Sequence, residues 1–208
     1  MTAHLTQRKE QKRKQILKAA IELFSKQGYG ISMDVIAEHA NVSKQTVYAH
    51  FSSKDHLFET CIIDKCMSAG LNWDLESDDR PGHEVLFEYG WLFQNMLLGE
   101  EARNTFHNTM RQSDTHPEIA KIFLEQGPKR NIALLSDYLS KLKNSGDLPF
   151  CEDTEAAAMQ LLLMLHGRSV YWGFFGFDAG EDEATRQTYI NKSVEVFLRG
   201  YGYPSTLL

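Results

Sequence analysis

The chain has 208 residues and a formal net charge of −6, and hydrophobic residues make up 42% of it. A chain of this length can bury about 70% of the surface that its unfolded form exposes, so no disulfide or metal is needed to hold its fold. Its three cysteines, Cys61, Cys66 and Cys151, form no CxxC pair, and we interpret them as reduced thiols in preference to a redox switch or a metal site. No cofactor is expected.

The first 15 residues are polar and charged, and no apolar run reaches the roughly 18 residues that a membrane-spanning helix needs. Neither a signal peptide nor contact with a membrane is therefore expected, and a cytoplasmic location is the default.

Charge is distributed unevenly along the chain. Residues 1–60 contain nine Lys and Arg against six Asp and Glu, a balance of +3, which leaves −9 for the remainder. A basic end on an acidic body suits a protein that contacts phosphates with one end only, although a +3 segment is also ordinary for a soluble helix pair.

Apolar residues recur at three- and four-residue spacing along nearly the whole chain, and no run alternates as a strand would. The expected fold class is therefore all-α, with about nine or ten helices. The first helix is expected over residues 7–27 and ends at Gly28, which accepts the positive φ of a helix C-terminus. Ser32 is expected to cap a second helix over residues 33–40.

Residues 42–51 are the most informative segment. Here Ser43 caps a short polar helix that follows helix 33–40 after a three-residue break, and Asn41 stands where the turn requires tolerance of the left-handed conformation. Two short helices joined by so tight a turn form a helix-turn-helix, whose second helix enters the major groove of DNA. Val47 and Phe51 are expected to face inward.

The rest of the chain reads as further helices. Ser52 or Ser53 is expected to begin a fourth helix that runs to about Leu71, with Ser52 and Asp55 as a capping box. A polar linker is expected over residues 74–82. Later helices are expected over residues 82–98, 100–112, 117–126, 128–144, 153–176 and 181–201, with a break at Gly127 and Pro128. The first of them is apolar on almost every side, which is typical of a helix in the middle of a bundle.

Residues 12–60 resemble the TetR family of bacterial transcription regulators in the order and spacing of more than a dozen positions. These include Ile16-Leu17-Lys18-Ala19-Ala20, Leu23-Phe24, Gly28-Tyr29, Ser32-Met33, Ile36-Ala37, Val42-Ser43-Lys44, Thr46-Val47-Tyr48, His50-Phe51, Lys54 and Leu57-Phe58. To a smaller extent, residues 117–176 are similar to the ligand-binding half of the AefR-like branch, at Pro117-Glu118-Ile119-Ala120, Gly127-Pro128, Gly146-Asp147-Leu148, Ala156-Ala157 and Gly167. The resemblance implies a DNA-binding domain over residues 1–55 and a ligand-binding and dimerisation domain over residues 56–208.

The expected partner is a double-stranded, palindromic DNA operator. Two residues of the recognition helix can contact the edges of bases: Lys44 can donate to guanine, and Gln45 can pair with adenine. Gln45 stands where the family usually has a small residue. The resemblance implies that others in this region contact phosphates. The full set of residues expected to contact DNA is Ser32, Ser43, Lys44, Gln45, Thr46, Tyr48, Ala49, His50 and Lys54. Tyr48 as a packing aromatic and His50 as a helix C-terminal hydrogen bonder stay open as alternatives. A basic arm before Arg13 either reaches DNA or is a solvated terminus, and the second is favoured.

The resemblance also implies a homodimer through the last two helices and a pocket for a small hydrophobic or amphipathic effector. Two sets of residues on these helices are expected to supply the dimer contact: the small residues Ala156, Ala157, Ala158 and Gly167, and the apolar residues Leu161, Met164, Leu165, Tyr189, Ile190, Val194 and Phe197. The alternative is that these stripes are only intramolecular core. The expected effector residues are Phe87, Trp91, Phe106, Met110, Phe123, Met164, His166, Tyr171, Trp172 and Phe175, with Asn95, Arg103 and His107 as further polar candidates.

The function expected is therefore a repressor that a small effector releases from its operator. An activator or global regulator of the same fold, and a ligand-binding protein without DNA function, are the alternatives. An enzyme is disfavoured because no HExxH, GxSxG, P-loop or dinucleotide-binding motif occurs.

Overall fold

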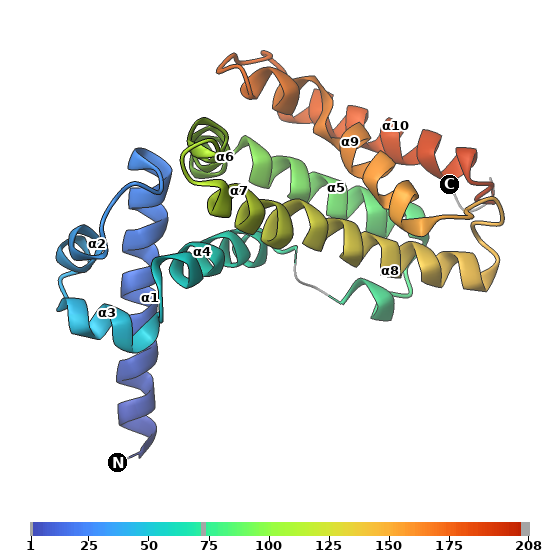
Figure 1. Ribbon diagram of the computed structural model, residues 1–208. Coiled ribbons are helices and arrows are strands. Elements are labelled where there is room, and N and C mark those ends of the chain that lie inside the picture. Colours follow the sequence, from blue (N-terminus) through green and yellow to red (C-terminus); the bar gives the residue numbers. More distant parts are fainter. Residues whose placement is uncertain (1, 72–73, 205–208) are drawn as a thin grey trace. The chain divides into compact units, whose positions relative to one another are not determined.

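The computed structural model describes residues 2–71 and 74–204, with side chains from residue 6 onward. All regular structure in this part of the chain is helical (Figure 1), which confirms the all-α class. None of its helices is long and apolar enough to span a bilayer. The chain divides into two compact units, Met1–Lys65 with Glu100–Gly127, and Cys66–Gly99 with Pro128–Leu208.

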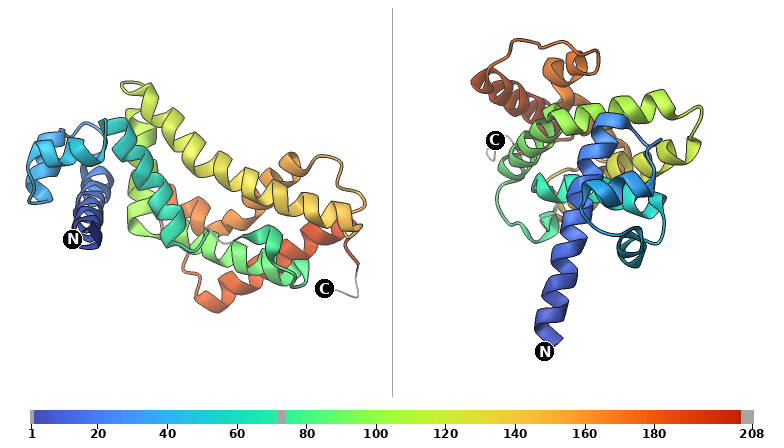
Figure 2. Two further views of the ribbon diagram at one scale, coloured as in Figure 1. Left: turned by 90° about the horizontal axis from the view of Figure 1, so that it is seen from below. Right: turned by 90° about the vertical axis from the view of Figure 1, so that its left-hand side faces the viewer.

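The first unit is built on a long N-terminal helix. Its helices are α1 (Thr2–Gln27), α2 (Met33–His39), α3 (Lys44–His50), the beginning of α4 (Lys54–Ser68), α6 (Glu100–Gln112) and α7 (Pro117–Leu124). Because α1 begins before the expected residue 7, its first turns extend beyond α3 as a helical arm (Figures 1 and 2). The helix ends where expected, at Gly28, whose φ is 78°.

The core of the first unit joins the helix-turn-helix to a helix from much later in the chain. Ile16, Ala20, Ile36 and Val47 are fully buried there together with Ile119 of α7. Burial of about 25 cal/mol per Å² of apolar surface is what holds these short helices, which would be marginal alone.

Two amide side chains of α6 bind the C-terminal end of α1. Asn108 Nδ2 donates to the carbonyl oxygen of Ser25 at 2.6 Å, and Gln112 Oε1 accepts from the backbone N–H of Tyr29 at 2.8 Å. The last carbonyls of a helix lack intrahelical partners, so this clamp satisfies groups that the helix itself leaves open. A β-carbon at Gly28 would lie 2.3 Å from Gln112 Nε2, so any larger residue would have to displace this amide.

The second unit is a bundle. Its elements are the 3₁₀ turn η1 (Leu75–Ser77), α5 (Gly82–Leu98), α8 (Arg130–Ser145), α9 (Thr154–Gly173) and α10 (Glu183–Gly200). As expected, α5 is central: Val85, Leu86 and Tyr89 are fully buried, and a β-carbon at Gly90 would lie 2.6 Å from Leu165.

Three expected boundaries are wrong. The fourth helix ends at Ser68 because Gly70 turns with φ 83°. The linker over residues 74–82 contains the turn η1, whose Leu75 is only 1% exposed and packs in the core of the second unit. The break expected at Gly127 and Pro128 is instead a π-helical turn, η2 (Glu125–Lys129), between α7 and α8. Proline removes one backbone donor, and the wider turn accommodates it without ending the helix.

Helix α9 contains a kink at Gly167, whose φ of 60° and ψ of −174° are not helical. Side chains of neighbouring helices satisfy the carbonyls before it: Tyr189 Oη donates to Met164 at 2.9 Å, and Gln94 Nε2 donates to Leu165 at 3.0 Å. Arg186 completes the network by donating to the Gln94 side chain at 3.2 Å. The kink is thus stabilised by a buried hydrogen bond from Gln94 of α5 and by an exposed one from Tyr189 of α10.

The three cysteines are free and buried, in agreement with their interpretation as reduced thiols. Burial raises the pKa of the Cys61 thiol far above its usual range, which keeps it protonated and unreactive.

We predict that Gly28→Ala lowers the free energy of unfolding by about 1–2 kcal/mol, because alanine resists a positive φ and its β-carbon displaces Gln112. Urea denaturation measures the change. Gly30→Ala is the matched control, since nothing lies within 4 Å of its β-carbon position. Equal destabilisation by the two variants would show that the clamp adds nothing.

We also predict that Gln94→Leu lowers the free energy of unfolding by about 1–3 kcal/mol, because it leaves buried carbonyls at the kink without donors. Gln160→Leu, which removes an exposed hydrogen bond to Tyr201 from the same unit, should change it by less than about 1 kcal/mol. Thermal denaturation of both variants tests the difference, and a stability of Gln94→Leu equal to that of the unaltered protein would contradict it.

Candidate nucleic-acid interface

The turn between α2 and α3 has the geometry that the sequence predicts. Asn41 adopts φ 49°, and the N–H of Val42 reaches back to the carbonyl of Ala37 at 3.0 Å. Ser32 caps α2 by accepting from the N–H of Val35 at 3.3 Å, and Ser43 caps α3 by accepting from the N–H of Thr46 at 3.1 Å. These local bonds fix both helix starts.

The inner face of α3 is fixed to the first unit. Val47 and Phe51 are fully buried, as expected, and the guanidinium of Arg13 lies 5.2 Å from the centre of the Phe51 ring. Gln15 Nε2 donates to the carbonyl of Ala40 at 2.6 Å, so α1 also closes the end of α2. The sequence did not predict these contacts of Arg13 and Gln15, because only folding of the first unit brings these residues close to others far along the chain.

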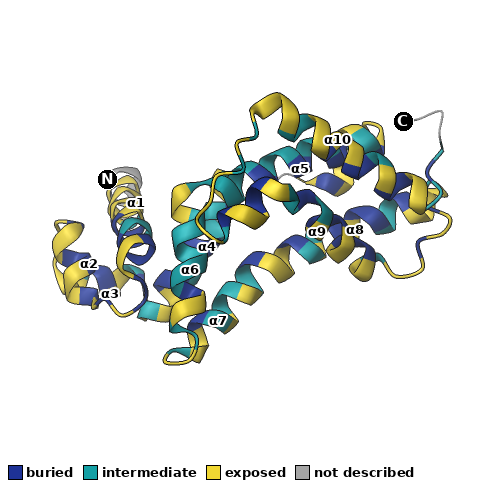
Figure 3. Cartoon of the chain, turned by 90° about the horizontal axis from the view of Figure 1, so that it is seen from above, coloured by how far each residue is buried: buried dark blue, intermediate teal, exposed yellow. Residues whose placement is uncertain are grey.

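The outer face of α3 is open to solvent. Lys44, Gln45, Tyr48 and Ala49 are exposed, and the burial pattern of α2 and α3 can be followed in Figure 3. Tyr48 is 47% exposed, which disfavours the alternative that it is a packing aromatic. Lys44 Nζ lies 2.9 Å from Asp34 Oδ2, an exposed pair weak enough to open for another partner.

The remaining polar residues of this region are partly engaged within the protein. The hydroxyls of Thr46 and Ser43 lie 2.8 Å apart, and the His50 ring packs beside Phe51. Lys54 Nζ donates to the carbonyls of Tyr29 and Ile31 at 3.0 and 3.3 Å. The same ammonium lies 4.0 Å from the centre of the Tyr29 ring, so Lys54 is held against the turn after α1.

The start of α4 differs from the expected capping box. Ser53, rather than Ser52, caps the helix by accepting from the N–H of His56 at 3.0 Å. The hydroxyl of Tyr29 donates to the Asp55 carboxylate, which therefore cannot turn back toward Ser52. Burial of the ring, and after it the same hydrogen bond, raises the pKa of Tyr29 well above its usual range.

The ten expected effector residues do not share one compact unit. Phe106, Met110 and Phe123 belong to the first unit, where the two phenylalanine rings lie 6.1 Å apart and Met110 is 61% exposed. In the second unit, Phe87, Trp91 and Met164 are partly buried against the core.

Two polar groups accompany the second-unit residues. The His166 ring packs edge-on against Phe93 at 5.6 Å, and burial lowers its pKa, so the imidazole is neutral at neutral pH. The guanidinium of Arg186, which was not foreseen, lies 4.6 Å from the centre of the Trp91 ring and donates to Asn95 at 2.8 Å.

The outer faces of α9 and α10, and the segment that follows α9, carry large apolar side chains in solvent. They are Met159, Leu163, Tyr171, Trp172, Phe175, Phe177, Tyr189 and Val196, which we call the apolar face. Tyr171, Trp172 and Phe175, expected around an interior pocket, are 60%, 42% and 65% exposed and so belong to this surface. Conversely, five residues expected at a dimer contact are buried core of the second unit, as the intramolecular alternative has it: Leu161, Leu165, Ile190, Val194 and Phe197. Tyr189 of the same expected set is 39% exposed.

Comparison with known proteins places both parts of the chain in one family. Residues 16–61 match the family model of bacterial regulatory proteins of the tetR family, and residues 84–203 match that of the AefR-like transcriptional repressor, C-terminal domain.

Two curated relatives agree. The biofilm operon icaADBC HTH-type negative transcriptional regulator IcaR of Staphylococcus aureus is 39% identical over 88 residues, which are 41% of this chain and 46% of the relative, so the match spans about half of that protein. The uncharacterized HTH-type transcriptional regulator YhgD of Bacillus subtilis is 43% identical over 159 residues, 74% of this chain and 81% of the relative.

Among solved structures, the flavonoid-responsive regulator FrrA superposes with a TM-score of 0.74 at 27% identity, covering 92% of this chain and 97% of its own. The family matches, the relatives and the shared fold agree with the expectation of a regulator rather than an enzyme. The chain belongs to the TetR family of bacterial transcriptional regulators.

Proposed function

We propose that this protein is a cytoplasmic repressor that binds a palindromic operator as a homodimer and is released by a small amphipathic effector. The observation that carries the proposal is the two-sided character of α3, whose Val47 is fully buried while Gln45 and Tyr48 lie in solvent. A helix held by one face and open on the other can enter a major groove without rearranging the head.

Base reading is assigned to the first turns of α3. Gln45 is exposed and can pair with adenine through its amide, while Lys44 leaves Asp34 to reach guanine. Ser32, Ser43, Thr46, Tyr48, His50 and Lys54 are assigned to phosphates, and Ala49 to a base edge. Phosphate contacts fix the position of the protein on the duplex but do not read its sequence. The base that Gln45 contacts would therefore distinguish this operator from those of relatives with a small residue at this position.

Dimerisation is assigned to the apolar face. Met159 and Leu163 are four residues apart on α9, and Tyr189 and Val196 are seven apart on α10, so each pair lies on one side of its helix. Monomeric soluble proteins rarely expose large contiguous apolar surfaces, and a second copy of the chain would cover this one. Two copies also supply the two recognition helices that a palindrome needs.

Repression and effector release are supported by the relatives. The AefR-like model describes repressors, IcaR is a negative regulator, and FrrA responds to flavonoids, which are amphipathic aromatic molecules. Within the second unit, Phe87, Trp91 and Met164 are partly buried against the core, and we assign them to contact such a molecule together with the neutral His166 and with Arg186, which lies over the Trp91 ring. An effector releases DNA only by binding the non-operator state more tightly than the operator state.

The proposal is tested by a mobility shift with the DNA upstream of the protein's own gene, at fixed salt because phosphate contacts make affinity salt-dependent. Retention of that fragment over random competitor, and its release by members of a panel of flavonoids and other amphipathic compounds, is the expected result. Binding to random duplex with equal affinity would overturn the proposal.

We predict that Gln45→Ala relaxes the preference at one base pair of each half-site by about 1–3 kcal/mol, because the bidentate amide contact is lost. Selection of binding sites from a random pool measures it. Gln160→Ala, an exposed glutamine of the second unit, is the control and should leave the selected sequence unchanged. An identical selected sequence for both variants would remove Gln45 from base reading.

We also predict that Leu163→Asp raises the dimer dissociation constant by about tenfold or more, because it buries a charge in the apolar face. Sedimentation equilibrium measures the constant. Leu124→Asp is the matched control, since Leu124 is also exposed, at 46%, but lies on α7. A monomeric unaltered protein, or equal effects of the two substitutions, would contradict the assignment.

A further inference from the structure

A guanidinium of α10 lies over an aromatic ring of α5, where these two helices of the second unit pack together. Arg186 is half-buried, and its guanidinium carbon lies 4.6 Å from the centre of the Trp91 ring. Its Nη1 donates to the side-chain oxygens of Gln94 and Asn95 at 3.2 and 2.8 Å. Both acceptors are neutral amides, so these bonds position the guanidinium without balancing its charge.

No carboxylate within the described ranges forms an ion pair with Arg186. The two that precede it most closely on α10 have other partners. Asp182 caps the helix by accepting from the N–H of Thr185 at 2.8 Å, and Glu183 accepts from the Gln187 side chain at 3.3 Å. The edge of the guanidinium formed by Nε and Nη2 also meets no acceptor in the same part of the chain. This edge is therefore open to a ligand.

A second arginine of the same unit stacks on a tryptophan and shows what completes such a pair. The guanidinium carbon of Arg168 lies 5.4 Å from the centre of the Trp172 ring, and its Nη2 lies 2.9 Å from Glu181 Oε1. Trp172 is 42% exposed, whereas Trp91 is half-buried, so the pair that is better shielded from solvent is the one without a carboxylate. A bound carboxylate at Arg186 would make the two pairs alike.

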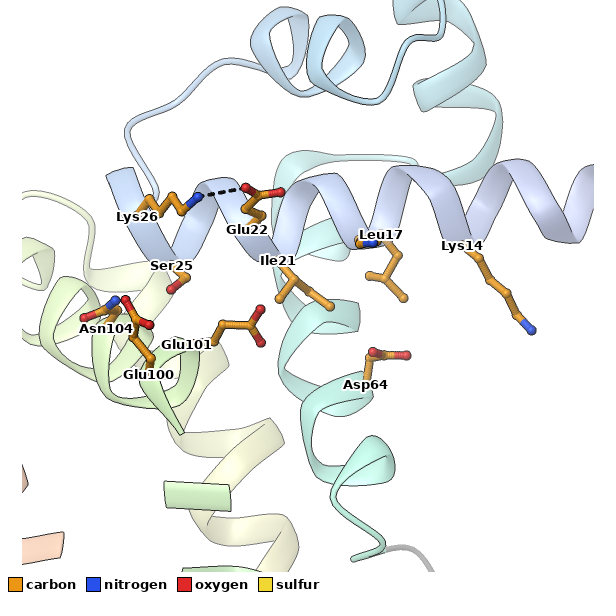
Figure 4. A pocket seen from close by; sticks show the side chains of 11 residues that line it. Lys14, Leu17, Ile21, Glu22, Ser25, Lys26, Asp64, Glu100, Glu101 and Asn104 are labelled. Atoms are coloured by element: carbon orange, nitrogen blue, oxygen red, sulfur yellow. Dashed lines mark hydrogen bonds and ion pairs between the residues drawn. The ribbon is translucent and has the colours of Figure 1, made fainter. Parts of the chain in front are cut away.

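Charged groups around the cavity of the first unit are balanced within the chain. This cavity has a volume of about 480 Å³, lies where α1, α4 and α6 meet, and has several carboxylates in its lining (Figure 4). Lys26 binds Glu22 at 2.8 Å and also attracts Glu100, and Lys65 binds Glu101 at 2.6 Å. Arg186 differs from these groups, because its charge has no opposite charge beside it.

We propose that Arg186 and Trp91 bind a small aromatic organic acid through its carboxylate. A carboxylate presents two oxygens in one plane, and they match the parallel N–H groups of the edge formed by Nε and Nη2. The aromatic part of the ligand lies against Trp91 and Phe87, which are four residues apart on α5 and both half-buried. The inference deepens the proposed function, on which it rests, by naming the chemical class of the effector.

The single cation sets the charge of the ligand. Arg186 can balance one negative charge, and burial lowers the pKa of His166, the other basic residue assigned to the effector, so that its imidazole adds no charge at neutral pH. A dicarboxylate or a phosphate ester would bring a second negative charge that neither residue balances. The site therefore selects a monocarboxylate.

Isothermal titration calorimetry of the full-length protein without DNA tests the proposal, with 2-naphthoate and its neutral isostere 2-naphthamide as probes. We expect 2-naphthoate to bind about tenfold more tightly or better, because only the acid forms charge-assisted hydrogen bonds. Arg186→Gln should remove this preference by weakening 2-naphthoate alone, and Trp91→Leu should weaken both probes. Arg168→Gln is the matched control, because Arg168 also stacks on a tryptophan but is already paired with Glu181.

Arg186→Lys is a second variant, which keeps the charge and loses the planar fork, and it should bind 2-naphthoate with a smaller preference than the unaltered protein. Circular dichroism shows whether each variant is folded before titration. Absence of 2-naphthoate binding at millimolar concentration, or equal affinity of the unaltered protein for both probes, would overturn the inference. An equal loss of affinity for both probes in the Arg186 variants would do the same.

The mobility shift described above separates this inference from the proposed function. We expect 2-naphthoate to release the retained DNA fragment and 2-naphthamide to leave it bound. A fragment that is retained by the protein and not released by 2-naphthoate contradicts the inference alone. Binding of 2-naphthoate by a protein that retains no specific fragment contradicts the proposed function alone.

Discussion

The arrangement of the helices in the first unit depends on the hydrogen bonds that fix the C-terminal end of α1. Asn108 and Gln112 of α6 supply a donor and an acceptor to the backbone at this end, and Gly28 leaves the space that Gln112 occupies. The held turn places Tyr29 so that its hydroxyl reaches Asp55 and its carbonyl accepts from Lys54. Helix α4 is therefore oriented on the same turn as α1. Three helices of the first unit meet at one short backbone segment.

The second unit has a comparable constraint of a different kind. The kink at Gly167 leaves carbonyls of α9 without their helical partners, and Gln94, only 1% exposed, is committed to Leu165 and His166. Since Arg186 in turn holds the oxygen of Gln94, the amide cannot rotate without breaking several bonds. A buried network of this kind rigidifies its surroundings only while every member is satisfied. A ligand packing on Trp91 would touch the cation that completes it.

Features that depend on neighbours in sequence were predictable. The caps at Ser32 and Ser43, the positive φ of Asn41 and the burial of Val47 follow from local chemistry and helical periodicity, and the structure confirms each of them. The class of fold followed for the same reason, because helix periodicity is a local signal.

Features that depend on contacts between residues far apart in the chain could not be predicted from the sequence. A glutamine at position 94 or 112 looks like any other in the sequence, and only packing shows which carbonyl or N–H it meets. The apolar stripes of α9 and α10 raised a related difficulty. Both sides of each helix carry apolar residues, so periodicity could not tell the face that packs inside the chain, with Leu161 and Ile190, from the exposed one.

The charge balance of the head illustrates how structure alters a conclusion from composition. Of its cations, Lys26 is paired with Glu22, Lys44 with Asp34, and Lys54 donates to carbonyls. Exposed pairs are worth little, and a phosphate can replace Asp34 at Lys44 with small loss. The helical arm of α1 differs, because Arg8 and Lys9 are exposed on a regular helix instead of a frayed terminus. Ordered cations lose less entropy on meeting phosphates than those of a flexible tail, since their backbone is already fixed. The cations of this arm are therefore solvated, as composition favoured, and five of the nine cations of residues 1–60 lie on the N-terminal half of α1.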